Sequence, residues 1–191
     1  MSKSTPLSVQ NAFNDKLKNS QEQAAAVKAA HDKARKAIKD DPMTSDLAKR
    51  GKLDALKTEA KAKLDALKES QESFVKGLRD KVEKEFHGNQ PTDAASVVSR
   101  RDAADRARKI TDKREAMEVL QDAIAGNDAD LAHAIGVKAR NSGWVDAAEA
   151  YTGAYPDTAG SAEALDYIDS NGPGTPAYNT LSSMTFSAPA D

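Results

Sequence analysis

The sequence predicts an all-α protein whose first half is a long antiparallel, coiled-coil-like hairpin of two helices. Its 191 residues are 30% charged, 39% apolar and only 5% aromatic, a composition typical of long solvated helices with thin cores. Apolar residues recur every three or four positions along residues 9–39 and again along residues 53–86. The connection between these stretches is short and contains Pro42, which makes the two helices antiparallel neighbours.

A seven-residue apolar period defines the first predicted helix, which follows a polar tail at residues 1–8. The helix ends at Asp40-Asp41-Pro42, because the residue before a proline avoids the α region. The seam follows two lines, one with Phe13, Ser20, Val27 and Ala34 and the other with Leu17, Ala24, His31 and Ile38.

An eleven-residue repeat defines the second predicted helix, which Thr44 or Ser45 can cap and which runs to Phe86. The sequence KLDALK occurs at 52–57 and again at 63–68, and eleven residues in three turns keep an apolar stripe aligned on one face. Stripes this rich in alanine bury little surface, so we expect the hairpin to need a third helix or another subunit. The residues expected to be packed are Leu56, Leu64, Leu67, Val75 and Leu78, and those expected to be solvated are Lys57, Lys61, Lys68 and Lys76.

The second half of the chain predicts a helical domain of shorter elements. Residues 87–91, HGNQP, end the hairpin, and Thr92 or Asp93 caps a third long helix that runs to Ala125. Three short helices follow, and the Gly-, Pro- and Ser-rich end of the chain predicts an extended tail. The short helices are expected at 129–141, 144–154 and 158–169, and the domains at 1–8 (tail), 9–87 (hairpin), 92–170 (helical C-terminal domain) and 171–191 (extended tail).

The composition excludes several functional classes. The chain has no cysteine, which excludes disulfides, thiolate zinc sites and cysteine nucleophiles. Its first residues, MSKSTPLSVQ, lack the apolar segment of a signal peptide, and no apolar run of about eighteen residues is present. We therefore expect neither a secretory signal nor a membrane partner.

The most basic stretch, residues 100–109, does not predict a nucleic-acid site. Its arginines alternate with Asp102 and Asp105 at spacings of three and four, which favours ion pairs within the helix. Nucleic-acid binding requires an unpaired basic face, with aromatic side chains where single strands are bound. We expect no nucleic-acid partner.

Charge is distributed unevenly along the chain. Residues 1–91 carry 19 Lys and Arg against 14 Asp and Glu, whereas residues 141–191 carry seven acids and no Lys or Arg. One interpretation is a contact between the basic end of one subunit and the acidic end of another. The alternative is ordinary uneven surface charge.

The three histidines do not predict a metal site. His31 lies on the seam of the first helix, His87 at a helix C-terminus, and His133 three residues after Asp130. His133 and Asp130 can share a helix face, but a metal site needs more ligands and no H-E-x-x-H motif is present. Gly-rich phosphate loops and nucleophile elbows are also absent from the sequence. We expect no catalytic residue, no cofactor and no metal, and we expect that the protein is not an enzyme.

An aromatic group occupies the region of short helices. Trp144, Tyr151, Tyr155 and Tyr167 can form a small core with neighbouring Leu, Ile and Val residues. They can also mark a protein interface, where Tyr and Trp are enriched. The candidate interface residues are Trp144, Tyr151, Tyr155, Leu181, Met184 and Phe186.

Residues 130–165, DLAHAIGVKARNSGWVDAAEAYTGAYPDTAGSAEAL, resemble a segment of helical virion-associated structural proteins from actinobacterial phages and their hosts. The shared pattern is a helix with LA-x-AI, a Gly-Trp turn, a second helix ending in Ala-Tyr, and a proline that starts a third. The resemblance implies a component of the phage head, neck or tail. A scaffolding protein of that group would end in a basic helix, whereas this chain ends in an acidic segment.

Two functional hypotheses follow from these observations. The first is a structural subunit of a bacteriophage particle, assembled in the host cytoplasm, which forms homo-oligomers and binds other virion proteins. The second is a bacterial cytoplasmic coiled-coil adaptor that binds another helical protein.

Overall fold

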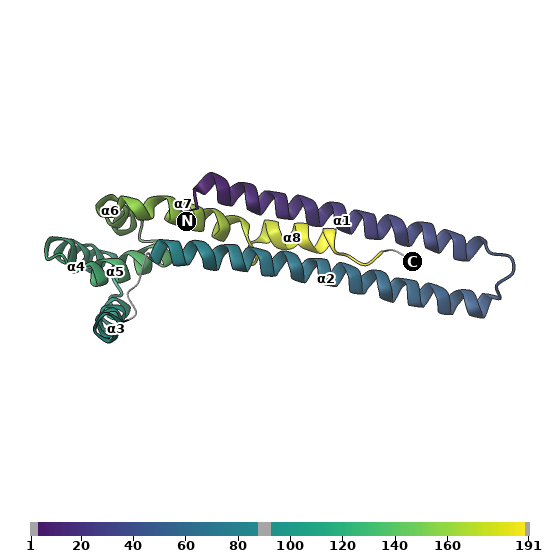
Figure 1. The fold of residues 1–191 in the computed structure, drawn as a ribbon, viewed down its shortest axis with the longest axis horizontal. Helices are drawn as coiled ribbons and strands as arrows, with labels where there is room; N and C mark the ends of the chain where they lie inside the picture. Colours follow the sequence, from purple (N-terminus) through teal and green to yellow (C-terminus); the bar gives the residue numbers. More distant parts are fainter. Residues whose placement is uncertain (1–3, 88–92, 190–191) are drawn as a thin grey trace. The chain divides into compact units, whose positions relative to one another are not determined.

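The computed structural model describes residues 4–87 and 93–189 (Figure 1). Within these residues it contains α-helices, one short 3-10 helix and no strand, which confirms the predicted all-α class. The helices are α1 (Pro6–Asp40), α2 (Asp46–His87), α3 (Ala94–Lys109), α4 (Lys113–Ala125), α5 (Ala129–Asn141), α6 (Val145–Ala154), α7 (Ala159–Asn171) and α8 (Pro176–Thr185), with the 3-10 helix η1 at Pro156–Thr158.

The chain forms two compact units that do not follow its linear order. Unit 1 comprises Met1–Pro6 and Lys81–Asp166, and unit 2 comprises Leu7–Asp80 and Tyr167–Asp191. The expected division into a hairpin, a helical domain and a tail is therefore wrong at its C-terminal boundary. The end of the chain belongs to the same unit as most of the hairpin.

Unit 2 contains the antiparallel pair of α1 and α2. Lys16 Nζ donates a hydrogen bond to Ser70 Oγ at 3.0 Å, and Lys49 Nζ donates to the carbonyl of Lys39 at 2.8 Å. The residue early in α1 contacts a residue late in α2, and the residue late in α1 contacts one early in α2. The two helices are therefore antiparallel. Helix α1 begins at Pro6 rather than at Val9, because proline is favoured in the first turn of a helix. The predicted tail at 1–8 was therefore too long.

The eleven-residue stripe of α2 is the packing face of that helix. Leu64 and Val75 are fully buried, and Leu56, Leu67 and Leu78 are half-buried. Three of the four lysines expected to be solvated are exposed. The exception is Lys57, which is half-buried, because long lysine stems cover apolar surface at the edge of such a stripe while the amino group stays in water. The exposed lysines are Lys61, Lys68 and Lys76.

Helix α8 replaces the extended tail that was expected at 171–191. The side chain of Thr175 accepts a hydrogen bond from the Tyr178 amide at 3.3 Å, and Pro176 occupies the first turn. Phe186, just after the helix, packs with Ala24 of α1 and Leu64 of α2. The third helix that the thin hairpin requires thus comes from the C-terminal end of the same chain.

Unit 1 is built around α5, which packs against α3, α4 and α6. The predicted third long helix, from residue 92 to 125, is instead two helices. Ile110 adopts an extended conformation, and the Asp112 carboxylate accepts hydrogen bonds from the amides of Arg114 at 2.8 Å and Glu115 at 3.3 Å, which starts α4. Of the two caps proposed for α3, Asp93 accepts a hydrogen bond from the Ser96 amide at 2.9 Å, and Thr92 lies outside the described residues.

The three short helices were predicted to within two residues of their ends. Helix α5 occupies 129–141 as expected, and Gly143, with φ of +68°, supplies the left-handed residue that ends it. The amide of Trp144 then donates to the Ala139 carbonyl at 2.8 Å. This closes the turn between α5 and α6, the Gly-Trp turn of the pattern at 130–165.

Candidate functional site

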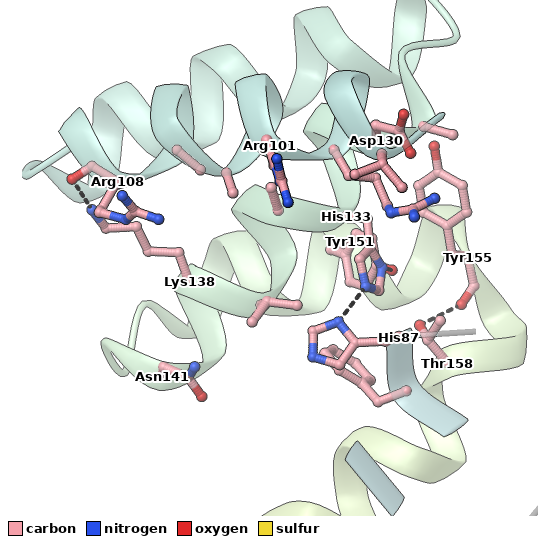
Figure 2. Close-up of a pocket in the computed structure, with 18 residues that line it drawn as sticks. His87, Arg101, Arg108, Asp130, His133, Lys138, Asn141, Tyr151, Tyr155 and Thr158 are labelled. Atoms are coloured by element: carbon pink, nitrogen blue, oxygen red, sulfur yellow. Dashed lines mark hydrogen bonds between the residues drawn. The ribbon is translucent and has the colours of Figure 1, made fainter. Parts of the chain in front are cut away.

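A cavity of about 880 Å³ lies within unit 1, between α3 on one side and α5 on the other (Figure 2). Phe86 and His87 at the end of α2 form part of its wall, as do Tyr151 of α6 and Tyr155. Its volume falls within the usual range of small-molecule pockets. A second cavity, of about 450 Å³, is lined by residues of α5, α6 and α7, together with Trp144.

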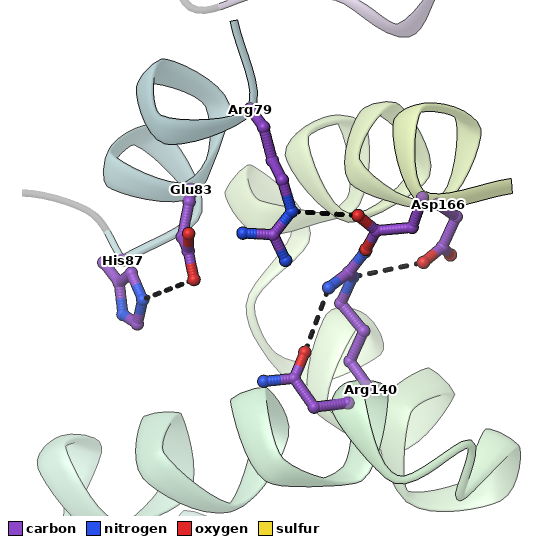
Figure 3. A network of polar contacts seen from close by, with 7 residues as sticks. Arg79, Glu83, His87, Arg140 and Asp166 are labelled. Atoms are coloured by element: carbon purple, nitrogen blue, oxygen red, sulfur yellow. Dashed lines mark hydrogen bonds and ion pairs between the residues drawn. The ribbon is translucent and has the colours of Figure 1, made fainter. Parts of the chain in front are cut away.

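A series of polar side chains in contact with one another forms the wall of the larger cavity opposite α3. Nδ1 of His87 and Nε2 of His133 are 3.0 Å apart, at hydrogen-bonding distance. Nδ1 of His133 in turn forms a hydrogen bond with the hydroxyl of Tyr151. At the other end, Nε2 of His87 is 4.0 Å from a carboxylate oxygen of Glu83, one helical turn earlier (Figure 3).

Two contacts in this series are hydrogen bonds, the one between His87 and His133 and the one between His133 and Tyr151. The 4.0 Å between Nε2 of His87 and the Glu83 carboxylate is too long for a hydrogen bond.

His133 and Tyr151 are both neutral at physiological pH. Burial, together with the neighbouring His87, lowers the pKa of His133 from 6.5 to about 4, against a smaller opposing effect of Asp130. Burial likewise raises the pKa of Tyr151 to about 12; the Thr158 hydroxyl opposes this shift and Tyr155 adds to it. An efficient general base has a pKa near the working pH. With a pKa of about 4, His133 is therefore a weak base at neutral pH.

A glycine allows Tyr151 to reach His133. Gly136 lies on α5 one turn after His133, and the Tyr151 ring rests against its backbone. A Cβ atom at position 136 would stand 2.3 Å from Cγ of Tyr151, a distance that real Cβ atoms do not show. The position of the ring, and with it the position of the hydroxyl, thus depends on the absence of a side chain at residue 136.

Cationic side chains surround the cavity. Arg100, Arg101, Arg108 and Lys138 contribute to its lining, whereas Asp130 is the single acid among the lining residues. This balance differs from that of unit 1, which carries twelve Lys and Arg against sixteen Asp and Glu. The cavity therefore concentrates positive charge within an acidic unit.

Several of these charged groups have partners that hold them in place. Arg108 forms an ion pair with Asp105 at 2.8 Å, and its carbonyl accepts a hydrogen bond from Lys138 Nζ at 2.8 Å. The Asp130 carboxylate accepts a hydrogen bond from Ser99 Oγ at 2.5 Å. Arg101 forms no ion pair with any described residue, and its side chain extends from α3 into the space that faces His133 (Figure 2).

The pairing of His87 with His133 could not be found from the sequence. The two residues are 46 positions apart, and no spacing or motif in the sequence links them. The third histidine, His31, is buried on α1 in unit 2, where its Nδ1 is 3.4 Å from the Asp32 carboxylate. Among the described residues there is no group of three or more His, Asp or Glu side chains arranged to hold a metal ion.

The six candidate interface residues differ in their exposure. Tyr151 and Phe186 are buried within their own units, so the interface hypothesis does not extend to these two core residues. Trp144 and Tyr155 are half-buried. Leu181 and Met184 are 40% and 68% exposed on α8, so they remain available to a partner.

Two further apolar side chains are exposed where α1 and α2 join, Met43 in the connection and Leu47 in the first turn of α2, and neither was predicted as a site residue. Met43 is 91% exposed and Leu47 is 80% exposed. The connection is nevertheless well defined, because the Asp41 carboxylate accepts hydrogen bonds from the Met43 amide at 2.8 Å and the Thr44 hydroxyl at 2.6 Å. The α1–α2 turn, residues 41–47, thus holds two apolar side chains in water.

Comparisons of the chain with protein-family models, curated protein sequences and solved structures find no match. In the part of the chain that the structure describes, every helix is too short or too polar to span a bilayer.

Proposed function

We propose that this chain is a non-catalytic structural protein that binds other protein subunits, as a component of the head, neck or tail of a bacteriophage particle. The observation that carries the binding function is the α1–α2 turn, where Met43 and Leu47 are 91% and 80% exposed. Apolar side chains gain free energy when a partner removes them from water, and a turn already held by Asp41 loses little entropy on binding.

The charge around the turn favours an acidic partner. The last turns of α1 and the first turns of α2, residues 33–52, carry seven Lys and Arg against three Asp. Residues 141–191, with seven acids and no Lys or Arg, give a second copy of the chain the complementary charge. This agrees with the hypothesis of contact between the basic end of one subunit and the acidic end of another.

Two observations support the other parts of the proposal. The phage assignment draws on the resemblance at residues 130–165, a segment that folds into α5, α6 and the first part of α7 as its pattern predicts. The non-catalytic assignment draws on His133, whose pKa of about 4 makes it a poor acid–base catalyst at neutral pH.

Light scattering over a range of protein concentrations tests the binding function. We expect the wild-type chain to associate, and the variant Met43→Ser/Leu47→Ser to remain monomeric at the same concentrations. Val98→Ser is the control, because Val98 is also an apolar residue, 64% exposed, and lies on α3 of the other unit. A wild-type chain that stays monomeric at every concentration, alone and with purified particle proteins, would contradict the proposal.

The location of the protein tests the phage assignment. We expect mass spectrometry to find the chain in purified phage particles at a stoichiometry comparable with that of other structural subunits. A cytoplasmic adaptor would use the same α1–α2 turn, so recovery only from the soluble fraction of the host would favour that alternative.

A further inference from the structure

We propose that the cavity between α3 and α5 of unit 1 binds a small organic anion, with an apolar body and one carboxylate, sulfonate or phosphate group. This ligand site goes beyond the structural function proposed above and does not depend on it. Three features of the cavity lead to this proposal: an apolar lining, an excess of positively charged side chains, and opposite charges at its two ends.

The apolar lining fits the body of such a ligand. Phe86, Val97, Ala104 and Val137 contribute to the wall, together with the ring of Tyr155. Ligand pockets are mostly apolar, with a small number of polar groups that fix orientation. A volume of about 880 Å³ accommodates a molecule with one or two aromatic rings.

The excess of positive charge selects an anion. Four cationic side chains and one carboxylate line the cavity, although unit 1 as a whole carries more acids than bases. Arg101 is the strongest candidate for direct contact, because it forms no ion pair with any described residue and extends into the cavity (Figure 2). A guanidinium matches the geometry of carboxylate, sulfonate and phosphate oxygens.

The arrangement of charges gives the ligand an orientation. Asp130, held by Ser99, lies at one end of the cavity, and Lys138, held by the carbonyl of Arg108, lies at the other (Figure 2). Repulsion from Asp130 and attraction to Lys138 place the anionic group between Arg101 and Lys138. His87 and His133 then form a polar wall beside the apolar body.

Two fluorescent probes that share one apolar body test the proposal in the full-length chain. Anilinonaphthalene sulfonate carries a negative charge, and N-phenylnaphthylamine is the corresponding neutral molecule. We expect the wild-type chain to bind the sulfonate about tenfold more tightly, the contribution of one charge-assisted hydrogen bond. Equal affinities for the two probes would overturn the proposal.

Two matched variants and the histidine signals locate the binding site. Arg101→Gln removes the charge from an exposed side chain and is expected to weaken binding of the sulfonate about tenfold, without changing the affinity for the neutral probe. Arg114→Gln, on α4 and 87% exposed, should change neither affinity. In proton NMR spectra the sulfonate should shift the ring signals of His87 and His133 and leave His31 unchanged. An equal loss of affinity in both variants, or a shift confined to His31, would overturn the proposal.

Discussion

The ring of Tyr151 lies against the backbone of Gly136, where a Cβ atom would stand 2.3 Å from Cγ of the tyrosine. This contact sets how closely α6 approaches α5, and it brings the Tyr151 hydroxyl to Nδ1 of His133. Because Tyr151 is 2% exposed, the ring has little free space into which it could move. The absence of a side chain at residue 136 thus determines the geometry of the contacts that run from Tyr151 through His133 and His87 to Glu83.

Gly136→Ala should destabilise unit 1 strongly. The new methyl group overlaps the Tyr151 ring, and overpacking of a closed core usually costs about 1–3 kcal/mol. Urea unfolding followed by the fluorescence of Trp144 measures the loss, because Trp144 is the only tryptophan of the chain and belongs to unit 1.

Gly153→Ala is the control for this substitution. Gly153 also lies in a helix of unit 1, but apart from its own helix backbone and its chain neighbours no atom lies within 4 Å of the position that its Cβ would occupy. Alanine is favoured over glycine in helices by about 1 kcal/mol, so this variant should be as stable as the wild type or more stable. Equal destabilisation by the two substitutions would contradict the contact between Gly136 and Tyr151.

The stability of unit 1 should fall as the pH falls from 6.5 towards 4. The folded-state pKa of His133, about 4, lies below its unfolded-state value of 6.5, so the unfolded chain binds more protons between these values. The free energy of unfolding is highest above pH 6.5 and falls on acidification, by at most about 3 kcal/mol. Urea unfolding between pH 7 and pH 5 isolates this effect from carboxylates, which titrate near pH 4.

The groups around His133 define the control for the pH experiment. His87 from α2, Tyr151 from α6 and Asp130 from its own helix face it, and Arg100 and Arg101 of α3 line the same cavity. In His133→Gln the pH dependence between 7 and 5 should be smaller than in the wild type. An unchanged pH dependence would show that another group is responsible.

Leu64→Ala should destabilise unit 2 far more than Lys61→Ala. Leu64 is fully buried on the α2 stripe and packs with Ala24 and Phe186, so its truncation should cost about 2–5 kcal/mol. Lys61 is exposed three residues earlier, and its truncation should stay within about 0.5 kcal/mol. Thermal melting followed by circular dichroism compares the two variants, and similar effects would contradict the role of the stripe.

The buried hydrogen bond from Gln71 Nε2 to the Tyr178 hydroxyl, 2.9 Å long, should couple α2 to α8. Tyr178→Phe leaves a buried amide without its acceptor and should cost about 1–3 kcal/mol. Gln71→Leu with Tyr178→Phe removes both partners and should cost less than the sum of the single substitutions. A double-mutant cycle in urea measures this difference, and strict additivity would argue against the bond.

Local signals in the sequence were sufficient to predict most of the helices. The eleven-residue repeat identified the buried face of α2, since periodicity depends only on helix geometry. Two errors came from capping residues that were overlooked. Asp112, followed by Glu115, starts α4, and Thr175, followed by Pro176, starts α8.

The candidate site could not be predicted in the same way. The cavity depends on the contact of α3 with α5 and on the approach of His87 to His133 across 46 residues, and both are products of tertiary packing. The basic stretch was interpreted as a self-paired helix face, and Arg108 does pair with Asp105. Arg101 differs from Arg108 in that its side chain points into the cavity, and neither composition nor spacing predicts where a side chain points.

The duplicated KLDALK sequence has a consequence for how the hairpin folds. A slip of α2 by eleven residues, about 16 Å along its axis, would bring Leu64 and Leu67 to the places of Leu53 and Leu56 and would preserve the apolar match with α1. The repeat therefore creates a competing register with little hydrophobic penalty. What distinguishes the two registers is the short connection at 41–45 and the one polar residue of the stripe, Gln71, which meets Tyr178 in the native alignment alone. The short connection thus opposes the slipped register while the hairpin forms, and Gln71 opposes it only once α8 has brought Tyr178 against the hairpin.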